Sequence, residues 1–226
     1  YRARRQRQMC IRDRISDAQF DQLENNLMRI NPNSDYFSDK KALPLPSLPK
    51  DQISEFIEGL LPNTRLIIEP KIDGCAIALQ YQNGILEKCI TRKGLDVTNK
   101  IKLIPDVPST VKVQGLFQVR GELYAPAEYD RPSYSQRQAG GFLRSRDSKS
   151  DHLSFAAFQI INGRLNQHDS LKFFKKFGFT IPEYKSCYFT SQVEMYRKQW
   201  TNKQLFTNYP TDGIVVKINS RKLQLI

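Results

Sequence analysis

The sequence predicts an α+β fold with antiparallel sheets and flanking helices, on the basis of three observations. Short apolar or alternating runs, separated by turn residues, follow one another from Leu66 onward. Segments with helical periodicity lie before these runs and again in the second half of the chain. The two kinds of segment do not alternate with the regular strand–helix–strand rhythm of a parallel sheet, and no internal repeat is present.

The first expected helix extends from Ile15 to Ile30. Ser16 can cap it and Asp17 lies near its positive end, while Phe20, Leu23, Leu27 and Ile30 recur at three- and four-residue spacing. Four prolines between Asn31 and Pro49 forbid a regular helix and predict an extended connector. Further helices are expected at Asp51 to Leu61, Leu171 to Phe177 and Val193 to Trp200.

The expected strands are apolar or alternating runs bounded by turns. They are Leu66 to Ile68, Cys75 to Tyr81, Leu86 to Thr91, Leu116 to Tyr124, Phe155 to Ile161 and Gly213 to Ile218. Between the second and third of them, Gln82-Asn83-Gly84 is a strong hairpin signal, because Asn-Gly suits the turns that join antiparallel strands.

Composition is typical of a globular protein: 39% of the residues are hydrophobic and 26% are charged. No run approaches the roughly 20 apolar residues that cross a bilayer, and no signal peptide is recognisable, so a cytoplasmic location is expected. The cysteines Cys10, Cys75, Cys89 and Cys187 are scattered, which disfavours a zinc site and favours buried, reduced thiols.

The formal net charge of +12 favours a polyanionic partner, because basic side chains that contact phosphates release counterions. Ribosomal and membrane-surface proteins share such a charge. Residues 1–14 contain six arginines and one aspartate and show no apolar periodicity. We interpret this segment as non-native or disordered, with a DNA-binding arm as the alternative, and exclude it from the fold prediction.

The string Glu69-Pro70-Lys71-Ile72-Asp73-Gly74 lies between two expected strands and is suited to nucleotidyl transfer. A lysine can attack a phosphorus atom only when it is deprotonated, so nearby charges, desolvation or a base must assist it. Asp73 is expected on the same side of an extended segment as Lys71, and Gly74 allows close approach of a ligand. Alone, this pattern is weak, because such a tetrapeptide also occurs in surface turns.

Two later strings strengthen it. Val119-Arg120-Gly121-Glu122-Leu123 places a carboxylate in a strand, and Thr211-Asp212-Gly213-Ile214-Val215-Val216-Lys217 ends a strand with a lysine. Taken separately, each is better explained by ordinary structure: a strand with a solvated glutamate in the first case, and a turn followed by a buried strand in the second. Their order and separation in one chain are a more specific signal.

Together, EPKIDG, QVRGELY and TDGIVVKIN resemble motifs I, III and IV of nucleotidyltransferases, in the form found in bacterial NAD-dependent DNA ligases. The resemblance extends from Ile15 to Ile226. The resemblance implies the ATP-grasp-like adenylation-domain fold, preceded by a short helical remnant. It makes Lys71 the adenylated lysine, Asp73 the aspartate beside it and Glu69 the adenine contact. Glu122 becomes the carboxylate that holds ribose and helps to place Mg²⁺, and Lys217 the lysine that contacts the α-phosphate.

Weaker matches extend the resemblance. Phe158, in LSFAAFQIIN, takes the place of an aromatic that stacks on adenine, although an ordinary core phenylalanine is the alternative. Arg137 and Arg144 resemble a pair of arginines that binds the phosphates of a nick. Their spacing is one residue shorter than in the family, and Arg146 is therefore an alternative to Arg144. Arg92 falls in the family's glycine-rich, cofactor-contacting loop, which is contracted here.

The segment ISDAQFDQL resembles the end of the family's NAD-specific domain, with Asp17 and Asp21 on its cofactor-binding aspartates and Phe20 in place of a tyrosine. A Tyr/His pair expected about ten residues earlier is replaced by Arg7 and Gln8. The resemblance implies residues 15–49 as the remnant of this subdomain with its connector and 50–226 as the adenylation domain. It ends before motif V and the DNA-encircling domains, so weak nick sealing is expected.

The implied enzyme loads AMP from NAD onto Lys71, releases nicotinamide mononucleotide and passes AMP to the 5′-phosphate of nicked double-stranded DNA. Mg²⁺ is the implied metal, and a monomer in the bacterial cytoplasm, associated with the nucleoid, is expected. Two alternatives remain open: an ATP-using ligase or capping-type nucleotidyltransferase, and a nick-binding module without activity.

Overall fold

The computed structural model describes residues 53–126, 134–145 and 152–225, and eight residues of the N-terminal part. These eight are Gln22, Leu23, Asn26, Leu27, Arg29, Ile30, Asn31 and Ser34. The chain divides into two compact units, Tyr1–Ala42 and Leu43–Ile226. We describe each unit by itself.

In the first unit, the described residues between Gln22 and Ile30 are helical, in agreement with the second half of the expected helix. The Asn31 N–H donates to the Leu27 carbonyl at 2.7 Å. The side chains of Leu23 and Ile30 are exposed. The expected start of this helix and, apart from Asn31 and Ser34, the proline-rich connector lie outside the described residues.

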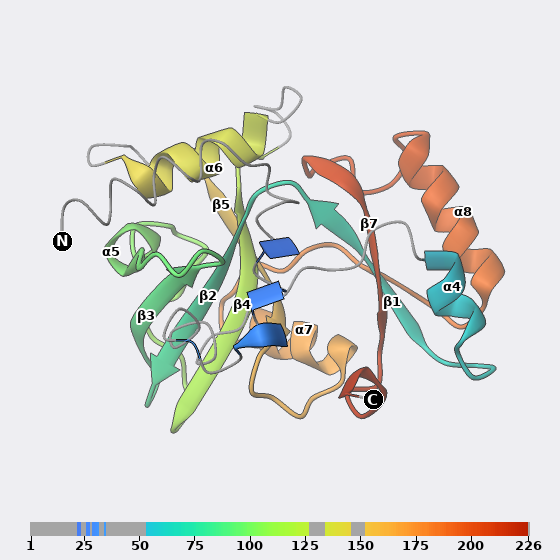
Figure 1. Cartoon of the computed structure of the whole chain (residues 1–226), viewed down its shortest axis with the longest axis horizontal. Helices are drawn as coiled ribbons and strands as arrows, with labels where there is room; N and C mark the ends of the chain where they lie inside the picture. Colours follow the sequence, from blue (N-terminus) through green and yellow to red (C-terminus); the bar gives the residue numbers. More distant parts are fainter. Residues whose placement is uncertain are drawn as a thin grey trace. The chain divides into compact units, whose positions relative to one another are not determined.

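The second unit contains two antiparallel sheets (Figure 1). The smaller sheet has the order β6-β1-β7 and the larger one the order β3-β2-β4-β5. The strands are β1 (Leu66–Ile72), β2 (Cys75–Gln82), β3 (Ile85–Thr91), β4 (Leu116–Tyr124), β5 (Ser154–Ile160), β6 (Lys185–Cys187) and β7 (Thr211–Ile218). Every strand pair is antiparallel, so the predicted fold class is confirmed.

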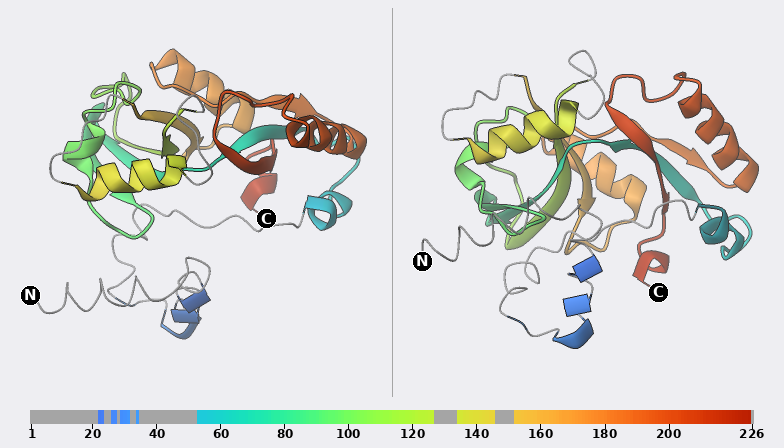
Figure 2. Two further views of the ribbon diagram at one scale, coloured as in Figure 1. Left: turned by 90° about the horizontal axis from the view of Figure 1, so that it is seen from above. Right: turned by 45° about the horizontal axis from the view of Figure 1, so that its top comes forward.

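Each sheet has its own hydrophobic core. Helices α4 (Ile53–Glu58) and α8 (Thr190–Thr201) contribute Ile57 and Val193 to the core of the smaller sheet. Helices α5 (Thr98–Ile101), α6 (Tyr134–Arg144) and α7 (Gln167–Lys176) pack on strands of the larger sheet (Figure 2). A short 3₁₀ turn, η3 (Leu223–Leu225), follows β7.

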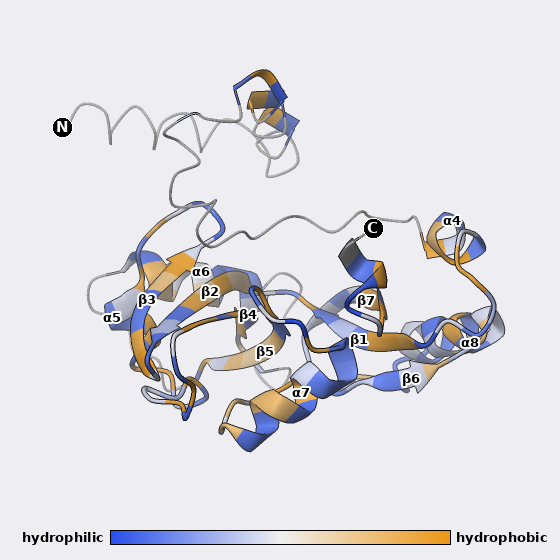
Figure 3. Cartoon of the chain, turned by 90° about the horizontal axis from the view of Figure 1, so that it is seen from below, coloured by the Kyte–Doolittle hydropathy of each residue, from blue (hydrophilic) through white to orange (hydrophobic). Residues whose placement is uncertain are grey.

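Coloured by hydropathy, α7 alternates between hydrophobic and hydrophilic residues along its length (Figure 3). This pattern is that of a helix with one buried face, and Leu171 and Phe174 form that face. None of the helices in the described part of the chain is both long and apolar enough to cross a membrane.

The observed elements depart from the expectations in two ways. Strand β1 continues through Pro70 to Ile72, beyond the expected end at Ile68, because β7 pairs with it as far as Ile72, whereas β6 pairs only with residues 66–68. A proline lacks the N–H that a central strand needs, but Pro70 lies where β1 has β7 as its single partner. The elements α5, α6 and β6 were not predicted.

The predicted hairpin is confirmed. Asn83 and Gly84 join β2 to β3 with φ angles of 49° and 84°, which is the backbone that an Asn-Gly turn provides.

Candidate active site

Lys71 lies near the end of β1, just before the chain passes from the smaller sheet to the larger one. Figure 1 shows this passage from β1 to β2. Strand β1 ends at Ile72 and β2 begins at Cys75, and the Asp73 N–H donates to the Pro210 carbonyl at 2.8 Å. A Cβ on Gly74 would lie 2.2 Å from the Leu123 carbonyl oxygen. Glycine is therefore required at this position by the close approach of β4, a reason in the protein itself rather than in a ligand.

A β-bulge brings Lys71 and Asp212 together. Pro70 pairs with Ile214 and Ile72 with Thr211, so that two residues of β7 lie opposite Lys71. A bulge changes the direction in which side chains project. The Lys71 Nζ donates to the Asp212 Oδ1 at 2.5 Å and Oδ2 at 2.6 Å. The ammonium group of Lys71 thus contacts both oxygens of one carboxylate.

Glu122, on β4 of the larger sheet, interacts electrostatically with both members of this ion pair. The pKa of the Glu122 carboxyl is raised to about 8, mainly by burial; Asp73 and Asp212 contribute to the rise, whereas Lys71 and Arg92 partly offset it. All four charged groups are therefore close enough to interact with Glu122. The structure thus brings Lys71 and Asp73, from the first motif, together with Glu122, from the second.

The raised pKa of Glu122 predicts a pH-dependent stability. The native state keeps this carboxyl protonated up to about pH 8, whereas the unfolded chain ionises it near 4.5. Because the native state binds the extra proton, stability falls as pH rises between these values. We expect the free energy of unfolding of Glu122→Gln, relative to that of the wild type, to increase by on the order of 2 kcal/mol from pH 5 to pH 9. Urea unfolding measures it.

The matched control for this prediction is Glu87→Gln, at an exposed carboxylate on β3. Its stability relative to the wild type should change little with pH. A constant difference between Glu122→Gln and the wild type across this pH range would contradict the prediction.

Glu69, Lys217 and Phe158 form a second cluster. The Lys217 Nζ lies 2.6 Å from the Glu69 Oε2 and 4.7 Å from the centre of the Phe158 ring. Phe158 is the extra residue of a second bulge, since Arg120 pairs with Gln159 and Gly121 with Ala157. The structure thus brings together the three residues expected to surround the nucleotide, and Lys217 contacts the two assigned to adenine.

Gln167 completes this second cluster. Its Nε2 donates to the Glu69 Oε1 at 2.6 Å and to the Phe158 carbonyl at 2.7 Å. Gln167 was not predicted, because nothing in the sequence relates it to a residue 98 positions earlier. No role was predicted for Asp212 either, although that residue lies within the third motif.

The pairing of Lys217 with Glu69 predicts a stability effect. The side chains of Lys217 and Glu69 are only 15% and 3% exposed. Removing one partner of a buried pair leaves an uncompensated charge, which costs about 3–5 kcal/mol. We therefore expect Lys217→Met to lower the free energy of unfolding by about this amount in urea titrations.

Two further variants test this explanation. Lys185→Met, at an exposed lysine of β6, should change stability by less than about 0.5 kcal/mol. Combining Lys217→Met with Glu69→Gln removes the buried charge and should restore much of the loss. Equal stability of Lys217→Met and the wild type would show that the pair contributes nothing.

The remaining candidate residues are placed as follows. Arg92 follows β3 in a tight turn, in which the Gly94 N–H donates to the Thr91 carbonyl, and it interacts electrostatically with Glu122. Arg137 and Arg144 are exposed on α6. Seven residues make almost two helical turns, so both arginines lie on the same side of α6, about 10 Å apart along its axis. Arg146, Asp17 and Asp21 lie outside the described residues.

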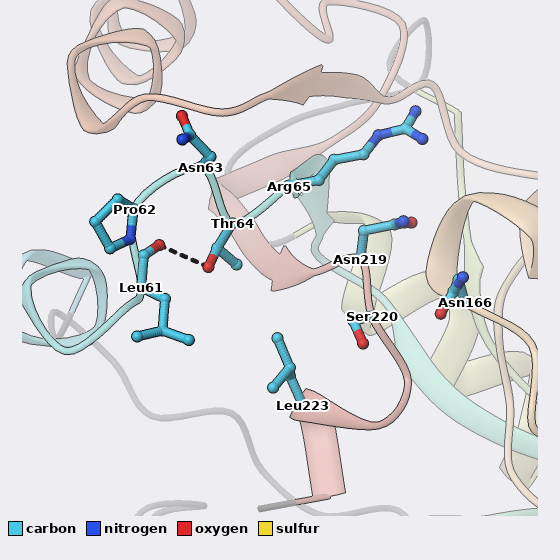
Figure 4. A pocket seen from close by; sticks show the side chains of 9 residues that line it. All are labelled: Leu61, Pro62, Asn63, Thr64, Arg65, Asn166, Asn219, Ser220 and Leu223. Atoms are coloured by element: carbon cyan, nitrogen blue, oxygen red, sulfur yellow. Dashed lines mark hydrogen bonds between the residues drawn. The ribbon is translucent and has the colours of Figure 1, made fainter.

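A surface pocket of about 350 Å³ (Figure 4) lies at the end of β1 and β7 that is remote from Lys71. Arg65 and Asn219, which line it, directly precede β1 and follow β7, whereas Lys71 and Asp212 lie at the other ends of the same strands. Its lining also includes Leu61, Pro62, Asn63, Thr64, Asn166, Ser220 and Leu223. None of the expected site residues that the structure describes lines this pocket.

Comparison with known families identifies the family of this chain. The family model described as the NAD-dependent DNA ligase adenylation domain matches residues 49–225. The chain belongs to this family. The match includes each of the three motifs and all described residues of the two clusters around Lys71 and Lys217.

Curated relatives of this family member are named DNA ligase. The protein from Petrotoga mobilis is 33% identical over 205 residues, covering 77% of this chain and 31% of the relative. The protein from Shouchella clausii is 34% identical over 179 residues, covering 68% of this chain and 27% of the relative. The chain therefore spans about a third of the length of these relatives.

Solved structures support the fold. An archaeal ATP-dependent RNA ligase superposes with a TM-score of 0.51 at 16% identity, covering 78% of this chain and 45% of that one. At this identity the likeness concerns the fold alone. Together with the family match, it confirms the predicted fold class.

Proposed function

We propose that this adenylation domain carries out the first step of an NAD-dependent DNA ligase. The Lys71 Nζ attacks the adenylyl phosphorus of NAD and gives up a proton. A P–N bond forms, the bond from that phosphorus to the bridging oxygen breaks, and nicotinamide mononucleotide leaves. The observation that carries this proposal is the contact of Lys71 with Asp212 beside Glu122. This contact offers a proton acceptor to a lysine nucleophile.

The second cluster is the proposed nucleotide site. Adenine stacks on Phe158, its exocyclic amine donates to Glu69, and Glu122 holds the ribose. In the structure the Lys217 ammonium lies above the Phe158 ring and pairs with Glu69. Contact of Lys217 with the α-phosphate therefore requires it to leave Glu69. Arg92 is proposed as a further cofactor contact, and Asp17 and Asp21 as contacts to the nicotinamide half of NAD.

The carboxylates near Lys71 fit a metal site that the protein forms only in part and that substrate phosphates and water complete. In the described ranges, no group of three or more His, Cys, Asp or Glu side chains is suited to hold a metal ion. Mg²⁺ commonly takes one or two carboxylates and completes its shell with substrate phosphates and water. Glu122, with Asp73 beside it, would hold the ion once ionised, and the ion would offset phosphate charge.

Nicked double-stranded DNA is the proposed partner of the second step, in which AMP passes to a 5′-phosphate. The exposed Arg137 and Arg144 of α6 and the net charge of +12 support it. We propose Arg146 as an additional phosphate contact. We also propose a monomer that acts at the bacterial nucleoid, with a domain boundary between residues 49 and 50.

A comparison of nucleotide donors tests the proposed function. The chain is incubated with Mg²⁺ and either NAD or ATP, and the covalent adduct is quantified by intact-protein mass spectrometry. We expect one AMP per chain from NAD, formed slowly and with stoichiometric release of nicotinamide mononucleotide. Faster loading from ATP would indicate an ATP-using enzyme, and no adduct from either donor would contradict the proposal.

A further inference from the structure

We infer that Gln167 is a positioning residue that fixes the Glu69 carboxylate for recognition of a 6-aminopurine. This inference rests on the proposed nucleotide site and extends it. Gln167 is 3% exposed and Glu69 2% exposed, so both polar groups are removed from water and must satisfy each other. Their contact joins the start of α7 to β1.

The orientation of the Gln167 amide is determined by its partners. Its Nε2 faces two acceptors, the Glu69 Oε1 at 2.6 Å and the Phe158 carbonyl at 2.7 Å. Only the NH₂ group can serve both, because a flipped amide would direct its oxygen at two other oxygens. Gln167 therefore always presents hydrogen-bond donors to this site.

The backbone holds Gln167 in place. Its N–H donates to the Asn219 carbonyl at 2.8 Å, and the next N–H, of His168, donates to the Asn219 Oδ1 at 2.9 Å. Asn219 directly follows β7, the strand that carries Lys217. The start of α7 is thus anchored to the end of the third motif, so Gln167 keeps its position whether or not Lys217 moves.

The two oxygens of Glu69 have different partners. Gln167 donates to Oε1, whereas Lys217 donates to Oε2 at 2.6 Å. When Lys217 turns toward a phosphate, Oε2 becomes available while Oε1 stays bound. An acceptor oxygen held beside the Phe158 ring suits the exocyclic amine of adenine and repels the O6 of hypoxanthine. Gln167 thereby contributes to the choice of base without touching it.

Binding of AMP and of inosine 5′-monophosphate, measured by calorimetry, tests this role. We expect the wild type to prefer AMP by at least about tenfold, since a buried acceptor left facing O6 is unfavourable. In Gln167→Met, which keeps the side-chain volume but cannot donate, the Glu69 carboxylate loses its fixed direction. The preference for AMP should fall to within about threefold of unity.

Glu69→Gln tests the same geometry with Gln167 intact. Gln167 would bind the oxygen of the new amide and turn its NH₂ group toward the base, where it can donate to O6. We expect the preference to reverse in favour of inosine 5′-monophosphate. Adding Gln167→Met should abolish this reversal. If the reversal came only from the loss of charge at position 69, it would persist in the double variant.

Gln192→Met is the matched control, because Gln192 accepts hydrogen bonds from the Tyr188 and Phe189 N–H groups of another helix start. It should keep the wild-type preference. An unchanged AMP preference in a folded Gln167→Met, or no reversal in Glu69→Gln, would overturn the inference while leaving the proposed function intact. Failure of the wild type to bind AMP, or equal binding of both nucleotides, would instead overturn the proposed nucleotide site itself.

Discussion

Lys71→Ala is expected to lower covalent AMP loading by at least about 10⁴-fold, because it removes the nucleophile on which the first step depends. Lys71→Arg should fail equally, although it preserves the positive charge opposite Asp212. A guanidinium stays protonated at any pH that the protein tolerates and cannot attack phosphorus. The side chain of Lys71 is 32% exposed, so both variants should fold. Labelled NAD, denaturing gels and intact-mass spectra measure the adduct.

The control for this prediction is Lys112→Ala, at an exposed lysine outside both clusters. It should load AMP at a rate within about twofold of the wild type. Undiminished loading in Lys71→Ala would show that another residue carries the nucleotide, and would remove the basis of the assignment.

Asp212→Asn is expected to slow AMP loading by about 10²–10⁴-fold, the contribution of a well-placed general base. In the native protein each Asp212 oxygen lies within 2.6 Å of the Lys71 Nζ, so the proton has a short path to an acceptor. Asparagine keeps the shape of the side chain but cannot take the proton. Single-turnover rates with NAD measure the loss.

The pH dependence separates a proton acceptor from a simple structural contact. In Asp212→Asn, solvent must remove the proton, so the rate should rise more steeply with pH than the wild-type rate. Glu194→Gln, at a half-exposed carboxylate of α8 that pairs with Arg197, is the control and should leave the rate unchanged. A wild-type rate and pH profile in Asp212→Asn would rule out a role for Asp212 in proton transfer.

Local sequence patterns predicted much of the fold. The runs from Leu116 and Gly213 became β4 and β7, and Asn83-Gly84 made the expected turn. These features depend on neighbouring residues: alternation for a half-buried strand and a positive φ for a tight turn. The helix α6 was missed, because its two adjacent glycines, Gly140 and Gly141, have low helix propensity and tertiary packing outweighs it.

The candidate site was predictable as a list of residues but not as an arrangement. The motifs gave Lys71, Glu122 and Lys217, and the structure places each of them beside another candidate residue. The contacts of Asp212 and Phe158 depend on bulges in two different strand pairs, and a bulge leaves no clear mark in a single sequence. Gln167 could not be predicted because its partners lie in β1 and β5, far from it in the sequence.

The measurement that tests the central claim most directly is identification of the residue that carries AMP. The chain is loaded from NAD, digested, and the modified peptide is sequenced by tandem mass spectrometry. The proposed function predicts a single AMP on Lys71, within the peptide that contains Glu69-Pro70-Lys71-Ile72-Asp73-Gly74. AMP on Lys217, or spread over several surface lysines, would contradict it.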